Sequence, residues 1–171
     1  MRSVSQRGFF LIEAMVAVLI FALGVLGMVA LGGTAIGAQS DARYRSDAAA
    51  LADEIAGQIA LNVDRSNVTI SPTSIQTSIA AFQMRESPAD PANASFCVFS
   101  GAAGNAITQT WNAKVQATGY GLSGLPNTTA TSQQIRVEND NASFNRVTIT
   151  ICWKSKTNEP WRHYTLVTYV N

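Results

Sequence analysis

One acidic side chain, Glu13, stands in an apolar run that is otherwise uncharged from Phe9 to Leu31. As a helix this run spans about 35 Å, which is enough to cross a bilayer core of about 30 Å. A carboxylate near the centre of a membrane costs on the order of 3 kcal/mol on insertion scales, so its presence indicates a specific partner. We therefore expect a positively charged group to meet Glu13.

The charges around the run give it a direction. Arg2 and Arg7 precede it, and no charged residue lies between Ala14 and Ser40. By the positive-inside rule, the N-terminus is cytoplasmic and the remainder of the chain is exported. The sequence therefore predicts a single-pass membrane protein with a large outer domain.

The two cysteines, Cys97 and Cys152, both lie in the part expected to enter an oxidising compartment. We expect them to be bonded to each other. In the chain-entropy model, closing a separation of 55 residues stabilises the fold by at most about 4 kcal/mol. The alternative is a pair of free buried thiols.

The remaining reactive side chains form no catalytic pattern. His163 is the only histidine, and its place in an expected strand between Arg162 and Tyr164 is typical of a surface imidazole. No Ser, His and Asp arrangement, no metal-ligand spacing and no phosphate loop occurs. We expect neither an enzyme nor a metal or cofactor site.

A long helix must carry the N-terminal features. Beyond the apolar run, large and small apolar residues recur at intervals of three or four, while most charges fall off that stripe. The stripe comprises Tyr44, Ala48, Leu51, Ile55 and Ile59. We expect the helix to continue to about Val63 and to pack its apolar face on a sheet.

The rest of the chain alternates between short elements and loops. We expect helical structure within Ile75–Phe82, a strand at Ser95–Ser100, a helix through Trp111 that ends near Gly119, and a surface loop at Thr118–Thr131. Alternating apolar residues then predict three strands, at Gln133–Glu138, Val147–Trp153 and Trp161–Val170, the last two forming an antiparallel hairpin. Cys152 lies on the threonine face of its strand, so the disulfide is expected off the main core.

The N-terminal pattern resembles the class III signal of type IV pilins and pseudopilins. A short basic leader ends in Gly8, Phe9 follows, and Glu13 is the fifth residue after that glycine. The resemblance implies that a prepilin peptidase cuts after Gly8 and methylates the new terminal amine of Phe9. It also implies that Glu13 meets the terminal amine of a neighbouring subunit in a fibre.

This resemblance implies an α+β, type IV pilin-like fold, with a long N-terminal helix packed on a C-terminal antiparallel β-sheet. The chain would divide into a leader at 1–8, the transmembrane half of the helix at 9–37, and the amphipathic helix with a globular head at 38–171. Loss of Arg2 and Arg7 with the leader leaves 10 basic against 11 acidic residues, a formal charge of −1. This near-neutral balance gives no electrostatic basis for nucleic-acid binding.

The tail resembles minor pilins of the PilV kind, through the Trp111 helix, the Leu125-Pro126 loop and the run from Val147 to Trp153. The Phe21–Gly27 stretch resembles them too. The resemblance implies a minor pilin that primes pilus assembly with other minor pilins and the major pilin at an inner-membrane assembly platform. Its head would lie in the periplasm and later in the fibre or at its tip, supporting adhesion and twitching motility.

Other interpretations remain open. A minor pseudopilin of a type II secretion system shares the leader and the helix. A secretory signal peptide has a usual apolar core of 7 to 15 residues, shorter than this run, although 33–35 is a passable cleavage site. A plain membrane anchor gives no reason for the spacing of Gly8, Phe9 and Glu13. A different class is an anchored enzyme or adhesin whose head acts alone, and the missing catalytic set argues against the enzyme.

Two further features each allow two interpretations. Glycines at 24, 27, 32, 33 and 37 could melt the helix locally in a fibre, or Gly33 and Gly37 could allow close helix contact. The aromatic residues of the terminal hairpin could pack in the core or form a binding face. They are Trp153, Trp161, Tyr164 and Tyr169.

Overall fold

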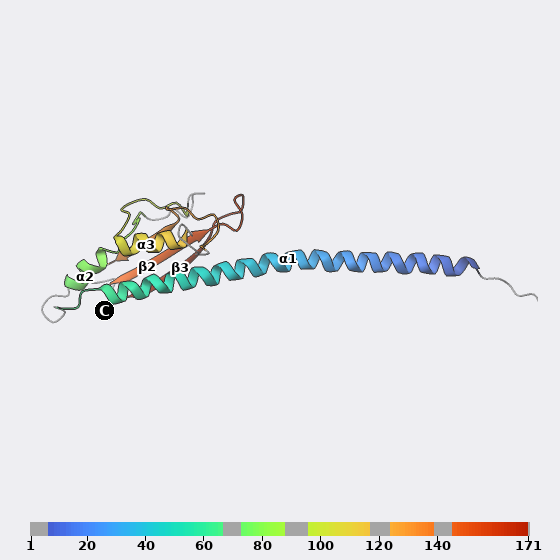
Figure 1. Cartoon of the computed structure of the whole chain (residues 1–171), viewed down its shortest axis with the longest axis horizontal. Coiled ribbons are helices and arrows are strands. Elements are labelled where there is room, and N and C mark those ends of the chain that lie inside the picture. Colours follow the sequence, from blue (N-terminus) through green and yellow to red (C-terminus); the bar gives the residue numbers. More distant parts are fainter. Residues whose placement is uncertain (1–6, 67–72, 88–95, 117–123, 139–144, 171) are drawn as a thin grey trace, which may run out of the picture. The chain divides into compact units, whose positions relative to one another are not determined.

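The structure, a computed structural model, describes residues 7–66, 73–87, 96–116, 124–138 and 145–170. These residues form the helices α1 (Arg7–Asn62), α2 (Thr73–Ala80) and α3 (Ala106–Val115) and the strands β1 (Gln133–Glu138), β2 (Arg146–Trp153) and β3 (Arg162–Tyr169). The fold is α+β, with a long N-terminal helix and a three-stranded antiparallel sheet (Figure 1). The chain separates into two units, Met1–Ala42 and Arg43–Asn171, and α1 contributes to both.

Helix α1 is continuous because its 56 residues include no proline. Its composition changes along its length. Side chains from Phe10 to Ile36 are exposed wherever they are described, whereas the predicted stripe further on is buried at Ala48, Ile55 and Ile59 and partly buried at Tyr44 and Leu51. The predicted end near Val63 is confirmed.

The C-terminal end of α1 is closed by side chains. Arg65 donates from Nη1 to the carbonyl of Ala60 at 2.7 Å, and Asn62 donates to the carbonyl of Gln58 at 2.8 Å. The bond to Ala60 satisfies one of the last four carbonyls of the helix, which have no partner inside it. Asp64 then accepts a 2.8 Å bond from the backbone N–H of Ser66. Hydrogen bonds from the side chain and then the backbone of Ser66 lower the pKa of the Asp64 carboxyl.

Helix α3 begins at an N-cap formed by a side chain. Asn105 accepts a bond from the N–H of Thr108 at 3.0 Å, the usual way to satisfy an orphan helix donor. Trp111 is buried and donates from its indole nitrogen to the carbonyl of Leu51 at 2.8 Å. This bond, together with the ion pair between Lys114 and Glu54, ties α3 to the second half of α1.

The sheet has the strand order β1-β2-β3, with both neighbouring pairs antiparallel. Ile149 of β2 faces Ile135 of β1 and Leu166 of β3, so apolar residues align across the strands. An isolated bridge between Met84 and Ile135 extends the pairing on the other side of β1. The predicted third strand and terminal hairpin are confirmed.

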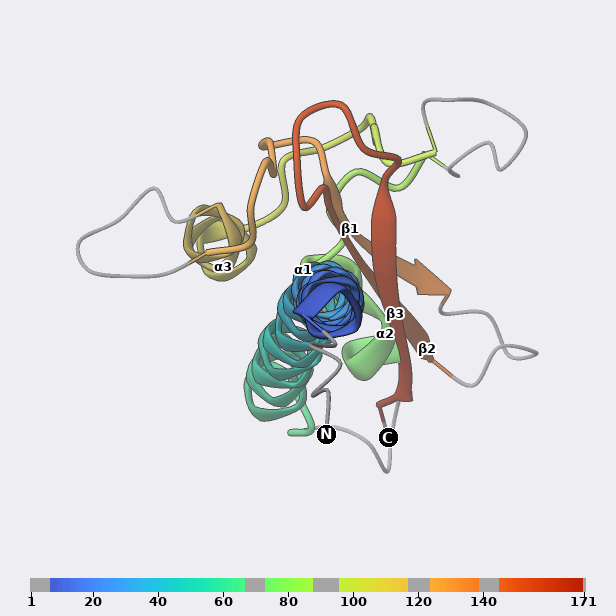
Figure 2. The same ribbon diagram turned by 90° about the vertical axis from the view of Figure 1, so that its right-hand side faces the viewer.

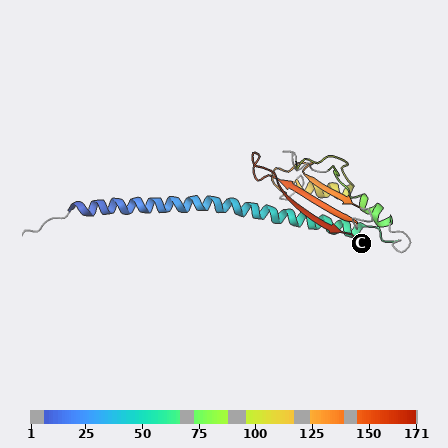
Figure 3. The same ribbon diagram turned by 180° about the vertical axis from the view of Figure 1, so that it is seen from behind.

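The helices cover one face of the sheet. Seen end-on in Figure 2, the second half of α1 lies on one side of the three strands, with α2 and α3 on that same side. Figure 3 shows the strands from the opposite side, with α3 behind them. The enclosed core contains Ala48, Ala52, Ile55, Ile59, Val63, Ile75, Ile79, Phe82, Met84, Trp111, Val115, Leu125, Ile135, Val137, Val147, Ile149, Ile151, Trp153 and Val170.

The predicted strand at Ser95–Ser100 is wrong for the residues described, 96–100, which form a turn and an irregular segment. Phe99 donates its N–H to Thr131, whereas the carbonyl of Ser100 accepts from Ser87. Because these bonds go to two different segments, no continuous ladder forms. The other predicted elements occur near their expected places, although Gly119 and the first part of the Thr118–Thr131 loop lie outside the described residues.

Candidate functional site

The apolar segment of α1 is the first candidate site. This helix is long and apolar enough to cross a membrane, and its most hydrophobic stretch is not buried by any other part of the described chain. Burial of apolar surface is worth about 25 cal/mol per Å², so these exposed side chains favour a lipid or protein environment over water. The coarser prediction of one membrane-length helix is therefore confirmed.

Glu13 lies on this segment and is exposed. Gly8 and Phe9 fall in the first turn of the same helix. A helix rises about 1.5 Å per residue, so the carboxylate of Glu13 projects about one turn beyond Phe9. The structure thus places the three residues of the N-terminal motif at one end of α1, whereas cleavage after Gly8, methylation of Phe9 and pairing of Glu13 stay predictions.

The glycines of this segment have open surroundings. A Cβ atom built at Gly24, Gly27, Gly32, Gly33 or Gly37 would have no heavy-atom neighbour within 4 Å outside the local helix. Helix α1 is unbroken through all five positions. Their absence of side chains is therefore not required by any packing within the described chain.

The two cysteines are bonded to each other, as predicted, with their Cα atoms 5.7 Å apart. Both are fully buried in a small cluster with Phe99, separate from the main core, and Phe96 and Trp161 pack against it. The predicted position of the disulfide off the main core is confirmed. The bond joins β2 to the irregular segment before α3.

His163 is exposed at the surface, as predicted. Its ring meets that of Phe96 edge-on, with 4.9 Å between centroids. Within the described parts of the chain, no group of three or more His, Cys, Asp or Glu side chains could hold a metal ion. The imidazole therefore packs against an aromatic ring.

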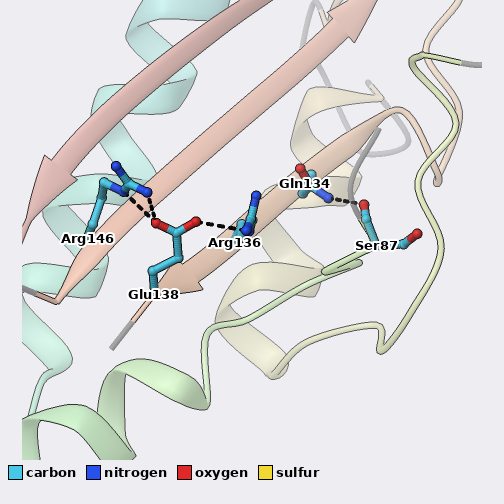
Figure 4. A network of polar contacts seen from close by, with 5 residues as sticks. All are labelled: Ser87, Gln134, Arg136, Glu138 and Arg146. Atoms are coloured by element: carbon cyan, nitrogen blue, oxygen red, sulfur yellow. Dashed lines mark hydrogen bonds and ion pairs between the residues drawn. The ribbon is translucent and has the colours of Figure 1, made fainter. Parts of the chain in front are cut away.

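Sequence reasoning missed a cluster of charges on the sheet. Glu138 lies between two arginines, accepting from Arg146 through Nε and Nη2 and from Arg136 through Nη2 at 2.9 Å (Figure 4). The register places Glu138 directly opposite Arg146. Because side chains alternate along a strand, the sequence of β1 alone places Arg136 and Glu138 on one face of the sheet. Only the pairing of β1 with β2 adds Arg146 to this cluster.

Beside this cluster, Gln134 holds the segment that follows Met84. Its amide donates to the carbonyls of Arg85 and Ser87 at 2.6 and 2.5 Å (Figure 4 shows the bond to Ser87). Arg85 itself is only 9 % exposed, and its buried Nη1 has no hydrogen-bond partner in the described structure. Desolvation by this burial lowers the pKa of the guanidinium.

A shallow hollow of about 320 Å³ lies between the 127–129 loop and the β2–β3 connection. The ammonium of Lys154 sits 4.6 Å from the centre of the Trp161 ring on its wall. Asn127 donates to the carbonyl of Lys154 and accepts from Thr157. The side chain of Asn127 thus links the 127–129 loop to the β2–β3 connection on both sides of the hollow.

No protein-family profile, no curated protein and no solved structure matches this chain. The molecule itself defines an α+β protein with one membrane-length N-terminal helix and a disulfide-bonded head.

Proposed function

We propose that this chain is a structural subunit of a fibre, specifically a minor type IV pilin processed after Gly8. The observation that carries the proposal is a single uninterrupted helix with two different surfaces. Its first part is apolar, exposed and carries one carboxylate, Glu13, whereas its second part is packed in the core of a head. One helix thus offers an assembly surface in its first part and contributes to the core of an exported domain in its second part.

The chemistry of Glu13 explains why the cut would matter. Cleavage after Gly8 creates a terminal amine at Phe9, which is the positive partner that a buried carboxylate requires. Within one helix this amine lies four residues, about 6 Å along the axis, from Glu13. A neighbouring parallel helix that is displaced along the axis by about one turn would bring its own terminal amine level with Glu13. The ion pair would therefore select one axial offset between neighbouring subunits.

The head supplies the features that distinguish one subunit from another. Its disulfide links the sheet to the 96–100 segment, and its α3 is tied to α1 by Trp111. In this proposal the head contributes contacts and not catalysis. Partners are the prepilin peptidase, other minor pilins, the major pilin and the inner-membrane assembly platform, with roles in adhesion and twitching motility.

Replacement of the carboxylate tests the proposal. Glu13→Ala should leave cleavage intact but reduce the amount of this protein in sheared pili more than a hundredfold, because an uncompensated buried charge costs about 3–5 kcal/mol. Met15→Ala is the matched control, since Met15 is an uncharged and exposed neighbour on the same helix. The ratio of fibre to membrane protein is measured by immunoblot.

A second variant tests the proposed cleavage. Gly8→Phe should leave an uncleaved precursor, which mass spectrometry of the membrane fraction would detect. Normal incorporation of Glu13→Ala would refute the proposed ion pair, and unchanged maturation of Gly8→Phe would refute the proposed cut.

A further inference from the structure

The hollow between the 127–129 loop and the β2–β3 connection has a wall of mixed character. Both loops lie at the end of the sheet where β1 begins and β2 ends (Figure 2). Small-molecule sites usually have volumes of about 300–1,000 Å³, so a hollow of about 320 Å³ has room for one ring-sized ligand. Its wall belongs wholly to the described part of the chain and comprises Asn127, Thr128, Thr129, Lys154, Thr157 and Trp161.

Hydrogen bonds join the two sides of the hollow and fix its shape. The backbone N–H of Lys154 donates to the carbonyl of Pro126 at 3.2 Å, and the amide of Asn127 donates to the carbonyl of Lys154 at 3.0 Å. Thr157 in turn donates its hydroxyl to the amide oxygen of Asn127 at 3.3 Å. A site whose walls are already held in place loses less conformational entropy when a ligand binds.

Lys154 supplies a positive charge to this wall. Its ammonium lies 4.6 Å from the centre of the Trp161 ring, a cation–π contact that holds the charge at the hollow. Within the described residues, no Asp or Glu forms an ion pair with this ammonium. An ammonium has three donors and no acceptor, so a carboxylate is its natural complement.

The threonine hydroxyls of the hollow present acceptors. Thr128 donates its hydroxyl proton to the carbonyl of Leu125 at 3.1 Å, and Thr157 donates its own to Asn127. A hydroxyl has one proton and two acceptor lone pairs, so each of these oxygens can still accept a bond from a ligand. A simple carboxylate has only acceptors and would match Lys154 alone, whereas a ligand with hydroxyl groups would match the threonines as well.

The remainder of the wall is carbon. It consists of the indole ring of Trp161 and the methyl groups of the threonines. The face of an aromatic ring is electronegative and attracts polarised C–H groups, such as those of a sugar ring. The hollow therefore combines a cationic donor, hydroxyl acceptors and an aromatic wall, and these match the carboxylate, the hydroxyls and the ring of one acidic sugar.

We propose that the hollow binds a uronic acid residue of a polysaccharide, with its carboxylate on Lys154, its hydroxyls on Thr128 and Thr157, and its ring against Trp161. This inference goes beyond the proposed function. It concerns the head alone and requires neither cleavage after Gly8 nor assembly into a fibre.

Saturation-transfer NMR tests the proposal on the full chain in micelles of a detergent that has no sugar headgroup. The probe is methyl β-glucuronide, and we expect transfer to its ring protons with a Kd on the order of 1 mM, as is usual for a ligand of this size. Methyl β-glucoside, which lacks the carboxylate, should bind about tenfold more weakly. Acetate should compete about tenfold more weakly as well, because it engages only the ammonium.

Three variants complete the design. Lys154→Gln should weaken glucuronide binding about tenfold and abolish the preference over the glucoside. Lys156→Gln is the matched charge control and should change neither affinity, because Lys156 does not line the hollow and its side chain is 83 % exposed. Thr157→Val keeps the shape of threonine without its hydroxyl and should weaken both sugars about fivefold. Near-UV circular dichroism checks that each variant is folded.

Any one of three results would overturn the inference. The first is the absence of transfer to the glucuronide at about ten times the expected Kd. The second is competition by acetate as strong as that by the glucuronide, which would make the hollow a simple anion site. The third is unchanged binding to Lys154→Gln. None of these results bears on Gly8, Phe9 or Glu13, and a chain that retains Met1 rejects the proposed function without affecting the hollow.

Discussion

Removal of the disulfide should destabilise the head strongly. Cys97 and Cys152 are both fully buried and are 55 residues apart. In the chain-entropy model, a loop of this length restricts the unfolded chain by about 14 cal/mol/K, which amounts to about 4 kcal/mol at 25 °C. For a folded unit of about 130 residues, Arg43–Asn171, this corresponds to a fall in Tm of about 15 °C.

The assay is urea unfolding of the full chain in detergent micelles, followed by tryptophan fluorescence. Trp153 and Trp111 are buried and report on the head. The double variant Cys97→Ala with Cys152→Ala is compared with the oxidised protein, and reduced parent protein is the control for the substitutions themselves. If the unfolding free energy falls by less than about 1 kcal/mol in both the reduced protein and the double variant, loop closure by the disulfide is not a main source of stability.

Three smaller perturbations test the packing of the head by the same unfolding assay. Trp111→Phe should lower the unfolding free energy by about 1–3 kcal/mol, because it removes the 2.8 Å bond to Leu51 and leaves a void; no loss would contradict the tie between α3 and α1. Arg85→Met should keep or raise stability, because an incompletely paired buried guanidinium is replaced by an apolar chain of similar length; a loss above about 2 kcal/mol would contradict this reasoning. Gly104→Ala should lower the unfolding free energy by about 1–3 kcal/mol, since φ is +81° and the new Cβ would clash with Thr108 Oγ1. The control is Gly57→Ala, because Gly57 has open space around it within α1. This change should raise the unfolding free energy by about 0.5–1 kcal/mol. If both changes shift the unfolding free energy in the same direction, the strain argument is refuted.

The long helix and the terminal hairpin could be predicted because each has a clear period. The spacing of Ala48, Ile55 and Ile59 marks one helical face, and the alternation from Val147 to Trp153 marks a strand. These local patterns correspond directly to burial in the structure. The disulfide could be predicted because the chain offers only two cysteines.

Contacts between distant segments could not be predicted in the same way. The bond from Trp111 to Leu51 joins residues 60 positions apart, and nothing in either local sequence specifies it. The arginine pair around Glu138 depends on the register of β1 against β2, which a sequence pattern does not fix when the connecting loop is unknown. The strand expected at 95–100 failed because its hydrogen bonds go to two separate segments.

The hairpin aromatics show the same limit. Trp153 is buried in the core, whereas Tyr169 is 56 % exposed. Alternation predicts that neighbouring residues face opposite sides, but not which side the remaining chain covers. The binding-face interpretation is therefore retained at Tyr169 and wrong at Trp153.

The mass and N-terminal sequence of the protein purified from membranes test the central claim most directly. We expect a chain that starts at Phe9 and carries a methyl group on its amine, since the proposed peptidase cuts after Gly8. An intact Met1 would contradict fibre assembly and indicate a plain anchor, and a start after Ala35 would indicate an ordinary secreted protein that has lost Glu13 and the apolar helix.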